Sequence, residues 1–106
     1  MATYKVLSQL NPSASTETTL YTAPGQAVVS TLMIANLAAT AATFRIAVRP
    51  AADGTTATKH WIVYGATVQG SDSTALTLGI TLALNDKIQV HASSANLSFS
   101  AFGSEI

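Results

Sequence analysis

The residues of this chain that could carry chemistry are few, and they stand apart from one another. His60 and His91 are its two histidines, and Asp53, Asp72 and Asp86 are three of its five acidic residues. A protein metal site needs several such ligands to converge, usually from closely spaced pairs. The two histidines fall in different predicted strands, with no third ligand candidate near either in the sequence. We therefore expect both to lie on a sheet face or at the surface, without a bound metal.

Catalytic sequence patterns are missing as well. Serines are plentiful, but no G-x-S-x-G segment marks a nucleophilic serine and no G-x-x-x-x-G-K segment marks a phosphate-binding loop. Paired carboxylates for glycoside hydrolysis would have to meet in a cleft. The three aspartates lie instead in predicted turns, where an aspartate side chain bonds its own backbone. The sequence therefore predicts a protein that is not an enzyme and has no cofactor.

Two pairs of residues could bind a partner rather than catalyse a reaction. Arg45 and Arg49 lie on one face of a predicted strand. They could hold an anion or an acidic group of a neighbouring subunit, or they could simply keep that face soluble. Trp61 and Tyr64 could stack against a sugar, but aromatic residues are also enriched in cores and interfaces. A core or interface role is the expected one for these two aromatic residues.

The composition indicates a surface that is covered in the working state. Only 9% of the 106 residues are charged, against about 25% in an ordinary soluble domain. Five basic and five acidic residues give zero net charge, which argues against nucleic acid as a partner. No apolar stretch is long enough to span a bilayer, so no membrane partner is expected. With no cysteine, the chain has neither a disulfide nor a thiolate metal site. A free monomer with so few charges is prone to association.

Apolar residues recur at every second position, which is the period of a half-buried strand. The run at 43–49 alternates in this way before Pro50, and the run at 76–84 alternates around Gly79, which is expected to mark a bend or bulge that splits it in two. With turn signals between the runs, the pattern predicts an all-β fold. We expect an antiparallel β-sandwich of about seven or eight strands, with jelly-roll or Ig-like Greek-key topology. The shared phase predicts a core of Phe44, Ile46, Val48, Leu76, Leu78, Ile88, Val90 and Phe99.

Two predicted strands are apolar on both sides. Strict alternation places Val29 opposite Leu32, and Trp61 opposite Tyr64. One apolar set in each strand is expected to face the core, and the other needs cover from a loop, a tail or another chain. The low charge favours another chain. The candidate interface residues are Val29, Met33, Leu37, Ile62, Tyr64, Arg45 and Arg49.

Three segments of the chain resemble small virion structural proteins of tailed bacteriophages, many of which come from cyanophages. They are LYTAPG at 20–25, the run from Asn36 that includes FRI at 44–46, and the closing SFSAFGSEI at 98–106. The resemblance covers nearly the whole chain after residue 16. Such proteins carry a small residue-Gly-Asp turn before the penultimate strand. Here that turn is Leu84-Asn85-Asp86, and asparagine accepts the same left-handed backbone conformation.

The resemblance implies a non-enzymatic virion protein that works as a capsid cement or decoration protein on the capsid surface. Its implied partners are the major capsid protein and further copies of itself, as a trimer by analogy with capsid three-fold sites. The alternative is a tail- or fibre-associated module that binds a receptor or glycan through Trp61, Tyr64 and the loop at 51–59. Residues 1–106 are expected to form one β-sandwich domain, with residues 1–15 as an N-terminal arm or an edge strand.

Overall fold

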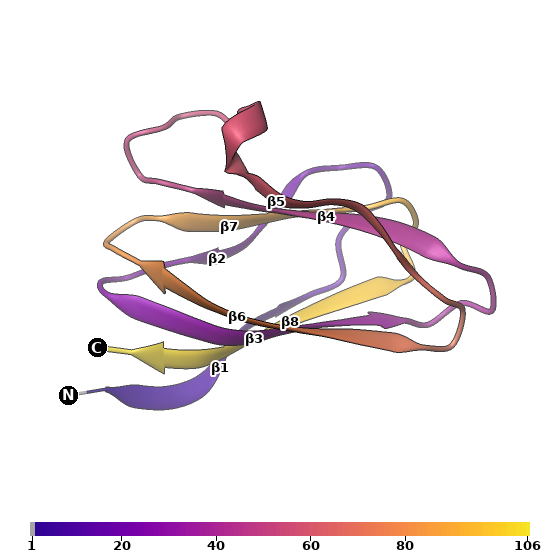
Figure 1. Ribbon diagram of the computed structural model, residues 1–106, viewed down its shortest axis with the longest axis horizontal. Coiled ribbons are helices and arrows are strands. Elements are labelled where there is room, and N and C mark those ends of the chain that lie inside the picture. The colour runs from indigo at the N-terminus through magenta and orange to yellow at the C-terminus, as the bar shows by residue number, and fades with distance from the viewer. Residues whose placement is uncertain (1) are drawn as a thin grey trace.

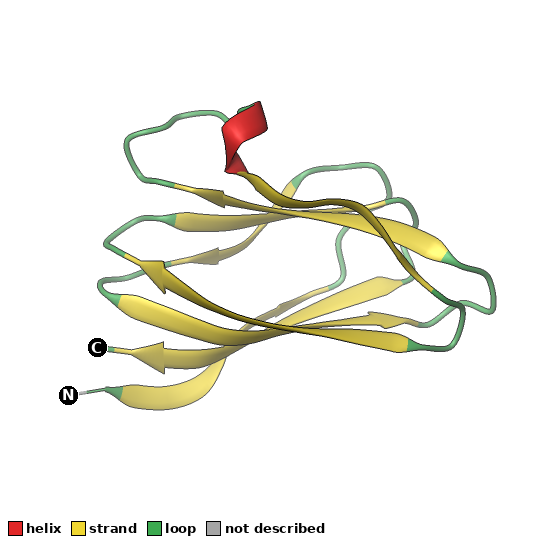
Figure 2. Cartoon of the chain, in the orientation of Figure 1, coloured by secondary structure: helices red, strands yellow, loops and turns green. Residues whose placement is uncertain are grey.

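Eight β-strands and one short 3-10 helix make up the part of the protein that the structure describes. The computed structural model describes residues 2–106, whose elements are shown in Figures 1 and 2. No helix in this part of the chain is long and apolar enough to cross a membrane. The elements are β1 (Thr3–Leu10), β2 (Thr18–Thr22), β3 (Ala27–Asn36), β4 (Ala42–Arg49), η1 (Thr58–His60), β5 (Trp61–Val68), β6 (Ser73–Leu82), β7 (Lys87–Ala92) and β8 (Leu97–Glu105).

The strands form two four-stranded antiparallel sheets that lie one above the other (Figure 1). The first sheet has the order β1-β8-β3-β6 and the second has the order β2-β7-β4-β5. Every connection except the one between β4 and β5 crosses from one sheet to the other. Eight strands in this arrangement form a double-sheet jelly roll. The predicted all-β antiparallel sandwich is therefore confirmed, and the jelly roll is the topology found.

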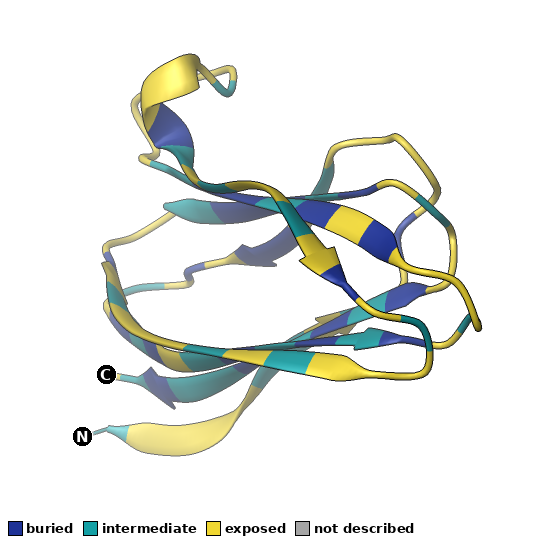
Figure 3. Cartoon of the chain, turned by 45° about the vertical axis from the view of Figure 1, so that its right-hand side comes forward, coloured by how far each residue is buried: buried dark blue, intermediate teal, exposed yellow. Residues whose placement is uncertain are grey.

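Large apolar side chains fill the space between the two sheets. Buried residues lie along strands of both sheets (Figure 3). Phe44 of β4 and Phe99 of β8 meet there edge to face, with their ring centroids 6.3 Å apart. Since β4 and β8 are both inner strands of their sheets, this contact joins the centres of the two layers. Most of the predicted core is confirmed. The fully buried members are Phe44, Ile46, Ile88, Val90 and Phe99, and Val48 and Leu76 are partly buried against them.

The prediction that Leu78 lies in the core is wrong, because a β-bulge turns it out of the sandwich. Val29 pairs with Ile80, but Thr31 pairs with Thr77. Two residues of β6 therefore oppose one residue of β3, and Leu78 is 47% exposed. Gly79, the second residue of this bulge, has φ +64°, a conformation that glycine adopts without strain. The predicted bulge is confirmed, but β6 continues through it as one strand rather than two.

The turn before β7 has the predicted conformation. Asn85 has φ +67°, the left-handed region that asparagine tolerates better than most residues. The Asp86 carboxylate accepts hydrogen bonds from the backbone N–H groups of Ala83 at 2.8 Å and Ala51 at 2.9 Å. Asp86 is thus a turn former, as its sequence position indicated, and it also holds the start of the β4–β5 loop.

Strand β1 forms one edge of the first sheet, where a polar cluster connects it to the rest of the sandwich. Lys5 Nζ lies 2.7 Å from Glu105 Oε1, and the Tyr21 hydroxyl donates to Glu105 Oε2 at 2.5 Å. Because Tyr21 belongs to β2, the cluster connects the two sheets. The hydrogen bonds from Lys5 and then Tyr21 lower the pKa of Glu105 below its ordinary value of 4.5. Burial, followed by the hydrogen bond to Glu105, raises the pKa of Tyr21.

Phe44→Ala is expected to destabilise the fold by about 3–5 kcal/mol, because it leaves a cavity at the contact between the sheets. Leu78→Ala is the matched control, since its side chain lies in the exposed bulge. Its effect should stay within about 0.5 kcal/mol, as for most surface substitutions. Urea denaturation of both variants measures the difference. An unchanged unfolding midpoint for Phe44→Ala would contradict the assigned strand phase.

The Glu105 cluster predicts a loss of stability in acid. A carboxyl group with a lowered pKa in the folded state takes up its proton more readily in the unfolded chain. Its contribution is therefore fully present above about pH 4.5 and is lost as the pH falls through the lowered value. Glu105→Gln should be less stable than the wild type at pH 7 and should lose less stability on acidification. Denaturation curves at pH 7 and at an acidic pH below the lowered pKa of Glu105 test this, with Glu17→Gln as the control. An equal loss of stability on acidification for the wild type and Glu105→Gln would contradict the prediction.

Candidate functional site

The outward side of the first sheet lacks charge. The pairing of the strands aligns outward side chains in three rows, each of which crosses all four strands. One row consists of Val6, Phe102, Thr31 and Thr77. None of the described strand residues that point outward from this sheet is charged. We call this surface the uncharged face. Its residues are Tyr4, Val6, Gln9, Val28, Thr31, Met33, Ala35, Ser73, Ala75, Thr77, Thr81, Ser98, Ser100, Phe102 and Ser104.

Large apolar side chains on this face are open to solvent. Tyr4 is 83% exposed and Val6 is half-exposed, both on edge strand β1, which is coloured as exposed along much of its length in Figure 3. Phe102 and Met33 are partly buried nearer the middle of the sheet. A solvated sheet face normally carries polar and charged residues. The uncharged face therefore departs from the pattern of an ordinary solvated sheet face.

Of the predicted interface residues in β3, Met33 lies on the uncharged face and Val29 does not. Val29 is buried in the core, so the expected opposition of Val29 and Leu32 is wrong. Ser30 is the cause, because it is an extra residue of β3 between the pairs Val29–Gly103 and Thr31–Phe102. This bulge lets both Val29 and Leu32 face inward. Leu37 lies beyond the end of β3 and is 72% exposed.

The outward side of the second sheet is basic. Arg45 pairs with His91 and Arg49 pairs with Lys87, so these four side chains share one side of β4 and β7. We call this surface the basic face. Arg49 is partly engaged there, because its Nη1 donates to Thr56 Oγ1 at 3.2 Å and the Thr56 hydroxyl donates to Glu17 Oε2 at 2.6 Å. Arg49 thereby helps to hold the β4–β5 loop.

His60 holds the same loop through two hydrogen bonds. Its Nδ1 accepts from the backbone N–H of Ala57 at 2.8 Å, which requires an unprotonated Nδ1. Its Nε2 therefore carries the proton and donates to Asp53 Oδ2 at 2.8 Å. This hydrogen bond is the main reason that the pKa of Asp53 is lowered. The expected surface or sheet-face position of His60 is wrong, because the ring is buried at the end of η1. Sequence reasoning missed the pair because the loop between the two residues has no periodic pattern.

Trp61 and Tyr64 form an aromatic corner at the edge of the basic face. Trp61 pairs with Ala47 and Tyr64 pairs with Arg45. Ile62 is an extra residue between the Trp61 and Val63 pairs, so the expected opposition of Trp61 and Tyr64 is wrong. The two rings meet edge to face at 5.5 Å and 74°, and the Arg45 guanidinium lies 4.1 Å from the Tyr64 ring centroid. A hollow of about 320 Å³ is lined by Thr58, Trp61 and Tyr64.

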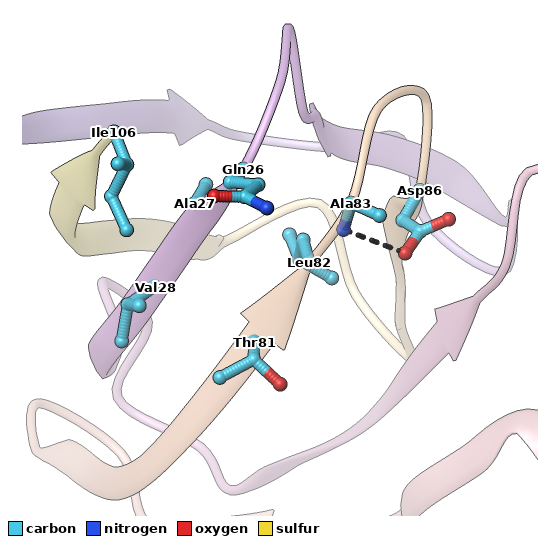
Figure 4. Close-up of a pocket in the computed structure, with 8 residues that line it drawn as sticks. All are labelled: Gln26, Ala27, Val28, Thr81, Leu82, Ala83, Asp86 and Ile106. Carbon is cyan, nitrogen blue, oxygen red and sulfur yellow. Dashed lines mark hydrogen bonds between the residues drawn. The ribbon is translucent and has the colours of Figure 1, made fainter.

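A second hollow, of about 400 Å³, lies at one end of the sandwich (Figure 4). It is lined by Gln26, Ala27, Val28, Thr81, Leu82, Ala83, Asp86 and Ile106. Asp86 is its single charged lining residue, and both oxygens of that carboxylate accept backbone N–H groups.

The histidines do not meet as ligands of one site. His60 contacts Asp53, whereas His91 lies on the basic face beside Arg45. Across residues 2–106, no group of three or more histidine, aspartate or glutamate side chains is close enough together to hold a metal ion.

The strand order and these two outward faces define an eight-stranded jelly-roll domain. Searches found no matching protein-family model and no similar curated protein. The fold is similar to chains in solved structures of infectious bursal disease virus. A chain in the crystal structure of the T13 IBDV viral particle is 12% identical with a TM-score of 0.56, and alignment covers 98% of our chain and 29% of that one.

Two further virus structures show the same likeness. The Gx strain gives 12% identity and a TM-score of 0.59, and the Gt strain gives 14% and 0.53. In both, alignment covers 98% of our chain and 32% of the viral chain. Our chain therefore spans about a third of the length of the chains it matches. At these identities the likeness shows a shared fold.

Proposed function

We propose that this protein is a non-enzymatic structural component of a virus particle and that it assembles through its uncharged face. The observation that carries the proposal is the absence of charge across the outward side of four strands, where Tyr4, Val6, Met33 and Phe102 are at least partly exposed. The similarity of the fold to chains of infectious bursal disease virus supports placing it in a virion.

The size of the uncharged face favours repeated contacts over one strong contact. Four strands at about 4.8 Å spacing and about eight residues at 3.3 Å each give roughly 500 Å². A stable standard interface buries about 800 Å² on each partner. One such contact is therefore smaller than a standard interface, and a closed oligomer or a lattice adds several of them together. A repeating shell is the setting in which this face is most effective.

Within the particle, we propose that the protein is a capsid cement or decoration protein of a tailed bacteriophage, on the capsid surface. It would contact the major capsid protein and form a trimer with two further copies. The bacteriophage assignment rests on the sequence resemblance at 20–25, 36–46 and 98–106. The competing role, a tail or fibre module, predicts few copies per particle and a function in adsorption.

Met33→Glu is expected to prevent self-association without unfolding the chain. Met33 pairs with Ser100 and Ala75, so the new carboxylate would lie in the middle of the uncharged face and be desolvated in any contact there. Light scattering after size-exclusion chromatography should give an oligomer for the wild type and a monomer for Met33→Glu. Thr67→Glu, on an exposed outward position of β5, is the control and should remain oligomeric. An oligomeric Met33→Glu variant or a monomeric wild type would exclude assembly through this face.

Copy number separates the cement role from the tail role. We expect the protein in purified virions at amounts comparable to the major capsid protein, measured by quantitative gel densitometry. Particles that lack it should lose resistance to heat while they still adsorb to cells. A band far below capsid stoichiometry, together with lost adsorption on deletion, would favour the tail or fibre module.

A further inference from the structure

The aromatic corner of Trp61 and Tyr64 has no part in the proposed assembly. It lies on the second sheet, whereas the uncharged face belongs to the first. Tyr64 is 64% exposed although its ring is large, and the hollow beside it is at the lower end of the usual size for small-molecule sites. The corner is thus an exposed aromatic surface that self-association would leave open.

The corner is held in place before any ligand arrives. Trp61 follows directly after His60, whose ring is buried and bonded to Asp53 and to the Ala57 backbone. The Arg45 guanidinium stacks on Tyr64, and Trp61 touches the same ring edge to face. A site with restrained side chains loses less conformational entropy on binding.

The charges beside the corner select the ligand. The Arg45 guanidinium lies against the Tyr64 ring, whereas the Lys59 ammonium is 4.0 Å from the Asp53 carboxylate. The Arg45 charge on the ring opposes a positively charged ligand, such as a quaternary ammonium, that aromatic rings otherwise attract. It favours a carboxylate or sulfate instead, which arginine recognises through its fixed fork of donors. Thr58 adds a hydroxyl group at the rim.

We propose that the corner binds a pyranose sugar that carries an anionic group. The C–H side of the sugar ring stacks on one of the two aromatic rings and touches the other at its edge, since the rings meet at 74°. Stacking is favourable because these C–H groups are slightly positive and the aromatic faces are slightly negative. The carboxylate or sulfate lies toward Arg45. The inference does not depend on the proposed function, since the isolated protein carries the whole corner.

Trp61 is the single tryptophan of the chain, so its fluorescence reports on this site alone. The probes are methyl glucuronide, glucose 6-sulfate, neutral methyl glucoside and choline, each titrated to about 10 mM, where millimolar binding is detected. We expect saturable fluorescence changes with one or both anionic sugars. Methyl glucoside should bind at least about tenfold more weakly. Choline should give no change. The two anionic probes distinguish carboxylate from sulfate recognition.

Three variants complete the test. Arg45→Gln should weaken binding of the anionic sugar at least about tenfold and remove its advantage over methyl glucoside. Tyr64→Ala should abolish the response, with circular dichroism confirming the fold. Leu84→Ala, which removes an exposed apolar side chain from the turn before β7, should bind as the wild type does.

The proposal is overturned if neither anionic sugar gives a saturable change, if choline binds equally well, or if Arg45→Gln and Tyr64→Ala leave binding unchanged. A negative result for sugar binding would not bear on assembly through the uncharged face, because assembly is tested separately by the molar mass from light scattering.

Discussion

The edge-to-face contact between Phe44 and Phe99 determines how the rest of this protein is arranged. It joins an inner strand of one sheet to an inner strand of the other, so both sheets must direct their large apolar side chains toward it. Strand alternation then fixes what the outer faces carry. Opposite the core on β8, the intervening positions are three serines and Phe102; on β4 they include two arginines. The core thereby creates one uncharged outer face and one basic outer face, and these make the two sides of the molecule suited to different partners.

Sequence periodicity predicted the fold where the strands keep a constant register. Phe44, Ile46, Ile88, Val90 and Phe99 all lie where alternation placed them. It failed where a bulge reverses the phase. Gly79 signals one bulge through its residue type, but Ser30 and Ile62 are unremarkable strand residues whose bulges become visible only from the pairing of neighbouring strands. The bulge at Ser30 explains why strict alternation places Val29 on the wrong face of its strand. The bulge at Ile62 explains why alternation places Trp61 and Tyr64 on opposite faces, although they lie on the same one.

The candidate surfaces were only partly predictable for a related reason. Met33 and Arg45 could be assigned to outer faces from their own strands. The uncharged face, however, is a property of four strands that are far apart in the sequence, and β1 showed no clear periodic pattern of its own. The serines at 98 and 100 share the phase of Phe102, which is the one local signal that this side of β8 is uncharged. The loop pair of Asp53 and His60 has no such signal, because loop geometry is set by individual hydrogen bonds.

The neighbouring positions of β1 and β8 have a consequence for protein engineering. Thr3 is paired with Glu105, so the start of β1 and the end of β8 lie side by side at one edge of the sandwich (Figure 1). A short linker could therefore close the chain into a ring, with new ends opened between the exposed residues Gly54 and Thr55. The same geometry allows the whole jelly roll to be inserted into a surface loop of a carrier protein through a single attachment point. Both outer faces would then remain free for display.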